Sequence, residues 1–161
     1  MYEEDSGEGR EKQEARTPPL SQSRADGEST SVVLAGEASH MTQARVGDVA
    51  VSPDGRYVAA AVGKEAILWD AATGDRHRLR RHAKPITSLA FSYDGEGLVT
   101  GSRDDSVIKW RTATGKVALR ETPQFGDIKD VSYSPDGRWV VTAGPITAAL
   151  LDAVTCGPPS C

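Results

Sequence analysis

Three residues in the middle of the chain have the types of a nucleophilic triad. They are His82, Ser102 and Asp104, and hydrolases use such residues as base, nucleophile and orienting acid. A hydrolase also needs an oxyanion site and a strained turn at its nucleophile, and no Gly-x-Ser-x-Gly sequence is present. The sequence therefore offers the residue types of a triad without the rest of a catalytic site, and we assign no catalytic residue.

The acidic and sulfur-containing side chains offer little to a metal ion. Asp54, Asp94 and Asp136 each stand before a glycine, and one carboxylate per turn is far short of the roughly six to eight oxygens that calcium takes. The two cysteines, Cys156 and Cys161, are far from the histidines in sequence. We therefore expect no metal and no other cofactor. Free thiols and a reducing compartment are expected, which favours a cytoplasmic location.

A short basic stretch has arginines that alternate along one face of an expected strand. Such a stretch either attracts a phosphate or an acidic partner, including the chain's own acidic N-terminal segment, or protects an outer strand from edge-to-edge pairing. We favour the second interpretation. The basic residues are Arg76, Arg78, Arg80, Arg81 and Lys84.

The elements that must position these side chains come from an internal repeat. Residues 51–59, 91–99 and 133–141 are similar in sequence, and the serine that each contains recurs after 40 and then 42 residues. Each copy holds an Asp-Gly pair, which favours a tight hairpin turn. A period of about 40 residues with turn signals inside it indicates an array of supersecondary units.

The second copy of the repeat divides into four short strands. Apolar and polar residues alternate before its Asp-Gly turn, and further turn signals separate the later segments. No stretch has the length of helical periodicity that a helix needs, so the pattern predicts an all-β array. The four strands are expected over residues 86–91, 98–101, 107–110 and 116–119.

These units resemble the WD-40 repeat family of β-propellers. The resemblance covers residues 44–157 and rests on the Ser-Pro-Asp-Gly turns, the Leu68-Trp69-Asp70 segment, the Thr-Gly pairs and a histidine, His82, ten residues before the serine of the second turn. In that family each blade is a four-stranded antiparallel sheet, and the blades stand around a channel. The resemblance therefore implies WD-repeat β-propeller blades.

The resemblance also implies a structural relay in place of the triad. In the family a histidine, a hydroxyl, an aspartate and a tryptophan often hold a blade together. Unit two keeps His82, Asp104 and Trp110, with either Thr100 or Ser102 as the hydroxyl. The two hydroxyl residues have the same strand parity, so the sequence does not choose between them.

The neighbouring units depart from this pattern. Unit one keeps Trp69, which we expect at the core of its blade, but has a Gly-Lys-Glu segment at residues 63–65 where the turn aspartate belongs. Unit three has Gln124 at the histidine position and Leu151 at the tryptophan position. We expect both units to depend on packing and to be less rigid than unit two.

The expected domain boundaries follow from the repeat and from composition. Residues 1–43 hold four basic and nine acidic side chains, which leaves a net charge of +1 for the rest of the chain and argues against a nucleic-acid partner. Residues 1–30 lack apolar periodicity and are expected to be disordered. The expected division is residues 1–30 as an acidic tail, 31–43 as a stray strand and linker, 44–81 as blade one, 82–123 as blade two, 124–157 as partial blade three and 158–161 as a frayed C-terminus.

The repeat count predicts an incomplete ring. Propellers of this kind close with roughly four to eight blades, and fewer than three whole units are present. Open blade faces and strand edges favour association, so the chain is either part of a longer array or closes a propeller by self-association.

The resemblance implies a non-enzymatic scaffold for protein partners. The alternative is a regulatory or sensor propeller of a larger multidomain signalling protein, whose ATPase or kinase part lies elsewhere. No apolar run approaches the roughly 18 to 20 residues of a membrane span, so no membrane partner is expected.

Overall fold

The computed structural model describes residues 45–123 and 126–153, which form eleven β-strands and no helix. All pairings are antiparallel, and the predicted all-β class is confirmed. Because none of the described residues is helical, none belongs to a helix that could cross a membrane. The predictions made for residues 1–43, for Gln124 and for residues 158–161 lie outside the described residues.

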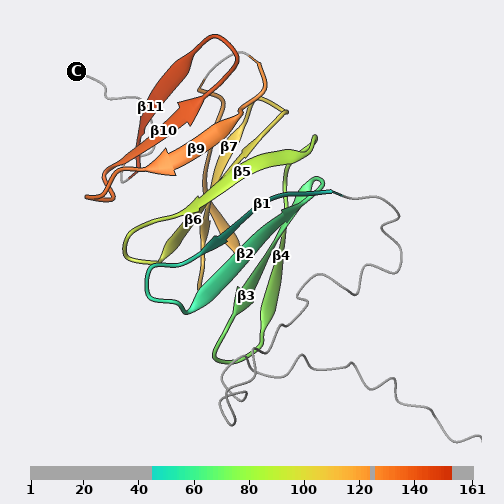
Figure 1. Cartoon of the computed structure of the whole chain (residues 1–161), viewed down its shortest axis with the longest axis vertical. Coiled ribbons are helices and arrows are strands. Elements are labelled where there is room, and N and C mark those ends of the chain that lie inside the picture. Colours follow the sequence, from blue (N-terminus) through green and yellow to red (C-terminus); the bar gives the residue numbers. More distant parts are fainter. Residues whose placement is uncertain (1–44, 124–125, 154–161) are drawn as a thin grey trace, which may run out of the picture.

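The strands form three separate sheets, one for each repeat (Figure 1). Blades one and two have four strands in chain order, and blade three has three strands among the described residues. Blade one holds β1 (Val46–Val51), β2 (Tyr57–Val62), β3 (Glu65–Asp70) and β4 (Arg76–Arg80). Blade two holds β5 (Ile86–Phe91), β6 (Gly97–Ser102), β7 (Val107–Arg111) and β8 (Lys116–Glu121). Blade three holds β9 (Asp130–Tyr133), β10 (Trp139–Ala143) and β11 (Ala148–Asp152).

A repeated Ser-x-Asp-Gly turn joins the first two strands of every blade. In the first turn the Ser52 hydroxyl donates to the Asp54 carboxylate at 2.5 Å and accepts the N–H of Tyr57 at 2.8 Å. Gly55 follows with a φ of 71°, a left-handed conformation that costs glycine nothing because it has no Cβ. The corresponding glycines of the other two turns have φ values of 72° and 70°. Local sequence is therefore sufficient to set each hairpin.

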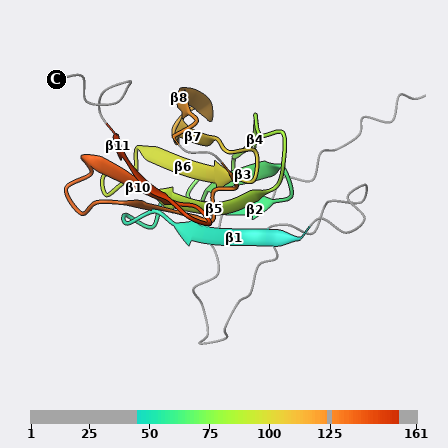
Figure 2. The same cartoon turned by 90° about the horizontal axis from the view of Figure 1, so that it is seen from above.

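The three sheets stand side by side in an open arc, with their first strands next to one another. β1 contacts β5, and β5 contacts β9, whereas β4 and β8 are the outer strands of their sheets (Figure 2). Among the described residues the arc does not close (Figure 1), which confirms the predicted incomplete ring.

Apolar side chains fill both gaps between neighbouring blades. Between blades one and two, Leu68 and Leu98 are fully buried in one cluster with Trp110. Between blades two and three, Val99 of β6 packs in a second cluster with Val131 of β9. Blades one and two thus each bury one face against the blade that follows.

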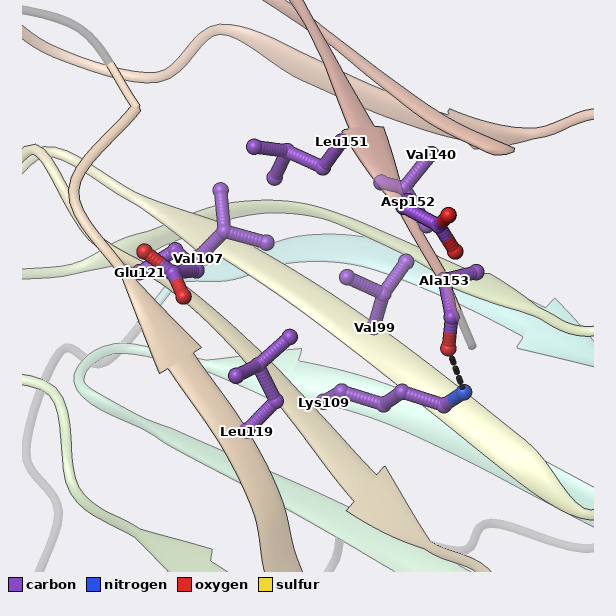
Figure 3. Close-up of a pocket in the computed structure, with 9 residues that line it drawn as sticks. All are labelled: Val99, Val107, Lys109, Leu119, Glu121, Val140, Leu151, Asp152 and Ala153. Atoms are coloured by element: carbon purple, nitrogen blue, oxygen red, sulfur yellow. Dashed lines mark hydrogen bonds between the residues drawn. The ribbon is translucent and has the colours of Figure 1, made fainter. Parts of the chain in front are cut away.

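A small cleft remains between blades two and three (Figure 3). Val99, Val107 and Val140 are among the side chains that line it, and the Lys109 ammonium donates to the Ala153 carbonyl at 2.6 Å (Figure 3). The cavity volume is about 10 Å³, which is room for one water molecule at most. The cleft is therefore part of the blade packing and is too small to hold a ligand.

Candidate functional site

The triad-type residues of unit two meet in a buried chain of hydrogen bonds. His82 lies in the segment before β5, Thr100 on β6, Asp104 in the turn after β6, and Trp110 on β7. The His82 Nε2 atom is 2.8 Å from the Thr100 hydroxyl, and Nδ1 is 3.2 Å from both carboxylate oxygens of Asp104. The Trp110 indole N–H donates to the Thr100 hydroxyl at 2.9 Å. Four segments of one blade are tied together through these contacts.

The hydrogen bonds of this chain have one self-consistent direction. Because the Thr100 oxygen accepts from Trp110, its own hydrogen can donate to Nε2 of His82 at 2.8 Å, a closer acceptor than the Ile108 carbonyl at 3.4 Å. A neutral His82 then carries its proton on Nδ1 and donates it to Asp104, an assignment that follows from the network. Burial lowers the pKa of His82, and the Asp104 carboxylate offsets this only in part. The buried environment therefore favours the neutral ring.

The carboxyl group of Asp104 is held in its ionised form by the groups around it. Burial alone would raise its pKa. The Ser106 hydroxyl at 2.5 Å, the Ala83 N–H at 2.7 Å and His82 act in the other direction and lower the pKa of Asp104 to about 2. An ionised Asp104 is a fixed acceptor for the imidazole N–H.

Two serines of this region have places that the sequence did not reveal. The Ser102 hydroxyl lies 2.9 Å from the Lys84 carbonyl and 3.0 Å from the Pro85 carbonyl, so of the two predicted candidates it is the Thr100 hydroxyl that lies next to the histidine. Ser106, which sequence reasoning missed, lies 3.1 Å from the histidine Nδ1 in addition to its bond to the aspartate. Its position two residues after an aspartate in a turn is the signal that could have found it.

This geometry has the form of a structural relay and leaves no activated nucleophile. Both ring nitrogens of His82 are engaged inside the blade. Thr100 and Ser102 are both 0% exposed, so neither hydroxyl can reach a substrate in solution. A general base must lie within hydrogen-bond reach of the proton that it removes from a nucleophile or a substrate, and His82 faces only the blade interior.

Blade one keeps the relay tryptophan but has Ala60 at the position of Thr100. Strand pairing places Trp69 at the position of the relay tryptophan, because each lies opposite the second residue of the preceding strand. Trp69 is buried and packs with Ala60 and Val62. Leu68, its neighbour in β3, belongs to the cluster shared with blade two. Trp69 therefore lies on the face of its sheet that points away from blade two.

Most of the predicted basic patch lies on β4, the outer strand of blade one. Arg80 Nε is 2.7 Å from the Glu65 carboxylate, and Arg78 is 3.9 Å from it. Glu65 lies opposite on β3, so its charge offsets part of the patch. This arrangement fits a charged outer edge that resists pairing with another strand. The remaining members are Arg76 on the same strand and Arg81 and Lys84, which are exposed in the segment that follows.

The turn aspartates make their hydrogen bonds within their own turns. Asp94 accepts from the Ser92 hydroxyl at 2.5 Å and from the N–H of Glu96 at 2.9 Å, and these two bonds lower its pKa. The same two kinds of bond lower the pKa of Asp54 and of Asp136. Within residues 45–123 and 126–153, no group of three or more metal-ligating side chains comes together.

Comparison with known families agrees with the three sheets. A family model described as "WD domain, G-beta repeat" matches residues 33–70, 75–111 and 119–145. The chain belongs to the WD40 repeat family. The second WD40 match contains the complete hydrogen-bonded chain from His82 to Trp110.

Three curated relatives show how much of a longer WD40 protein this chain matches. An uncharacterized WD repeat-containing protein of Synechocystis is 31% identical over 97 residues, which cover 59% of this chain and 28% of the relative. The Protein LST8 homolog of Drosophila melanogaster is 36% identical over 78 residues, with 43% and 25% covered. The Periodic tryptophan protein 2 homolog of Schizosaccharomyces pombe is 31% identical over 98 residues, with 59% and 12% covered. The matched region thus spans less than a third of each of these relatives.

Proposed function

We propose that this WD40 chain is a protein-interaction module that carries no chemistry of its own. WD repeat proteins are commonly interaction scaffolds, and this chain matches the repeat model three times. The relay of blade two supports the second part of the proposal, because its buried histidine is fully engaged in holding the blade. No specific observation favours the alternative of a regulatory propeller attached to a kinase or ATPase.

The observation that carries the proposal is an apolar sheet face that none of the described residues covers. In blade three, Val141 is 42% exposed and Leu150, directly opposite it on β11, is 54% exposed. Ile146, at the tip of the hairpin that joins their two strands, is 90% exposed. Adjacent exposed apolar residues of this kind mark interaction surfaces in soluble proteins.

Site-specific photo-crosslinking tests the proposal. A photoreactive phenylalanine analogue is placed at position 141 of the full chain in cells of the source organism, and the covalent adducts are identified by mass spectrometry. The matched control carries the analogue at Val117 of β8, which is 41% exposed. We expect adducts to a protein from position 141 in clear excess over position 117. Equal yields from the two positions would reject the interaction surface.

A further inference from the structure

The outer face of blade three lacks the cover that the same face has in the other two blades. Ala59, Val99 and Val141 are each the third residue of the second strand of their blade. Ala59 is 0% exposed and Val99 is 1% exposed, whereas Val141 is 42% exposed. Across the strand pair, Leu68 opposite Ala59 is fully buried and Leu150 opposite Val141 is more than half exposed. A following blade covers the first two faces, and none of the described residues covers the third.

The other end of the arc carries the matching surface. Leu89 of β5 and Val131 of β9 are each 4% exposed because they pack against the preceding blade. Val49 holds the same position in β1, since all three residues lie opposite the fourth residue of the second strand. Val49 is 65% exposed, and Val46 on the same strand is 54% exposed.

The second and third strands of blade one show the same difference. Leu98 and Ile108 of blade two are 0% exposed under blade one. Their equivalents in blade one, by strand pairing, are Val58 and Ile67, and these are only partly buried. Blade one therefore presents a face of the kind that blades two and three bury.

A polar contact also repeats from blade to blade. The Asp48 carboxylate of β1 accepts the N–H of Leu89 of β5 at 2.9 Å. One blade further, the Ser88 hydroxyl accepts the N–H of Val131 at 3.3 Å. Asp130 stands at the next position of this series and is exposed. Its Oδ1 accepts from Ser88 and Val131, and no described residue donates to its Oδ2.

We propose that a second copy of this chain docks head to tail, so that its strand β1 packs on the outer face of blade three. Val46 and Val49 of the second copy would lie over Val141 and Leu150, and Asp130 would accept the N–H of Val49. That N–H bonds to its own neighbouring aspartate at 2.8 Å. The equivalent N–H of Val131 shares its hydrogen between its own neighbouring aspartate and the preceding blade. This inference rests on the proposed function and names the partner.

Symmetry makes a second copy a sufficient partner. Donor strand and acceptor face lie at opposite ends of one chain, so the contact is heterologous, and such contacts form a ring when the rotation closes. Two copies of three sheets supply six blades, which falls within the range of roughly four to eight blades that closes a propeller. Two such contacts, one at each junction between the copies, would cover both exposed ends of each copy.

The test uses the full chain and size-exclusion chromatography with multi-angle light scattering. The wild type is expected at twice its chain mass of 17.1 kDa. Val49→Lys at the donor end and Leu150→Lys at the acceptor end are each expected to be monomeric. The control is Val117→Lys, because Val117 is about as exposed as Val141 of blade three. This variant is expected to remain dimeric. Because all three positions are exposed, far-UV circular dichroism should show folded chains.

Mixing the two end variants tests the head-to-tail geometry. The Val49→Lys chain keeps an intact blade-three face, and the Leu150→Lys chain keeps an intact β1, so one contact per pair survives. We expect the mixture to form a dimer that neither variant forms alone. A monomeric wild type, a dimer that either variant leaves intact, or a mixture that stays monomeric would overturn the proposal. Crosslinks from position 141 to a foreign protein, together with a monomeric wild type, would reject the second copy and retain the interaction module.

Discussion

The direction of the hydrogen bonds around His82 decides what this side chain can do. A neutral imidazole has one donor and one acceptor, and here both are used, the donor by Asp104 and the acceptor by the Thr100 hydroxyl. Protonation of the ring would make Nε2 a second donor, and the Thr100 hydroxyl would have to turn its hydrogen to the more distant Ile108 carbonyl at 3.4 Å. Burial also lowers the pKa of His82, so the neutral ring is favoured and the buried chain acts as a structural clamp.

Removal of the Thr100 hydroxyl should destabilise the chain with little change in shape. In Thr100→Val the Trp110 N–H and the His82 Nε2 both lose their partner, and an unsatisfied buried group costs about 1–3 kcal/mol. Urea unfolding measures the loss. In a cycle with Trp110→Phe the two losses should not add, because both variants break the same bond. Strict additivity would show that the hydroxyl and the indole act independently.

Acid should destabilise the protein through His82 before it does so through Asp104. Folding lowers the pKa of His82 from its ordinary 6.5. The contribution of His82 to the free energy of unfolding is therefore complete above pH 6.5, and it is lost as the pH falls towards the pKa that His82 has in the folded chain. Each unit of lowering corresponds to about 1.4 kcal/mol. Asp104, with a pKa of about 2 against 3.8, adds its loss only below about pH 4.

Thermal melts between pH 7.5 and 5 measure the His82 contribution. The decline in melting temperature over this window should be smaller in His82→Asn than in the wild type. The control is His77→Asn, which removes a different histidine and leaves the buried ring of His82 in place. A decline of the same size in His82→Asn and the wild type would assign the pH dependence to other groups.

The Tyr133 hydroxyl is the one buried side-chain polar atom without a partner among the described residues. Burial raises its pKa well above the ordinary value of 10.0, and the nearby Asp94 adds to this. Phe91 occupies the equivalent position of blade two, since each residue lies opposite the second residue of the next strand. Tyr133→Phe should therefore be neutral or stabilising by up to about 1–3 kcal/mol in urea unfolding. A clear loss of stability would mean that the hydroxyl has a partner.

For single residues, the sequence predicted which residue types form the relay better than which atoms bond to one another. The resemblance to WD-40 repeats implied that His82, Asp104 and Trp110 belong to one relay, and the structure places them in one hydrogen-bonded chain. Thr100 and Ser102 point to the same face of β6, and the choice between them depends on where the segment before β5 crosses the sheet. That crossing is a tertiary contact, which strand parity does not encode.

The strands and hairpins were predictable because their signals are local. Each Ser-x-Asp-Gly turn closes through bonds among its own residues, so a short segment is enough to define it. Which face of each sheet meets the next blade is not local. Trp69 and Trp110, for example, lie on equivalent faces of their sheets, each away from the blade that follows, but blade one covers Trp110 and no described blade covers the face of Trp69. Alternation separates two faces of a strand but does not say what covers either of them.

Blade three is held to blade two by a close approach at Gly101. A Cβ on this residue would lie 2.5 Å from Ile128 Cγ2 and 2.7 Å from Val131 Cγ1. Gly101→Ala should therefore push the blades apart and cost about 1–3 kcal/mol, as overpacking does. Hydrogen exchange should rise in β9–β11 and stay unchanged in β1–β4 of the same sample. Uniform exchange across the three sheets would show that the blades unfold as one unit.

As far as the structure describes it, the arc of three blades leaves its two ends open while its interior is well packed. Apolar contacts fill both gaps between the blades. The outer strand β4 carries charged side chains along its free edge, and such charges disfavour pairing with another strand. Val141 and Leu150, in contrast, are large apolar side chains that the described residues leave exposed on the outer face of blade three. The arc is thus protected at an outer strand and unprotected at a blade face, which is the pattern expected where another blade belongs.

Closure by a second copy makes thermal stability depend on protein concentration. Folding and association are then one equilibrium, and a tenfold rise in concentration adds about 1.4 kcal/mol of stability to the dimer. With an unfolding entropy of about 2.1 cal/mol/K for each ordered residue of both copies, the melting temperature should rise by roughly 3 °C for each tenfold step. Calorimetry from micromolar to millimolar chain measures this slope. Leu150→Lys should melt lower and at one temperature throughout, since its unfolding no longer includes dissociation. A wild-type melting temperature that does not change with protein concentration would mean that each chain is stable alone, and that its exposed ends destabilise it little.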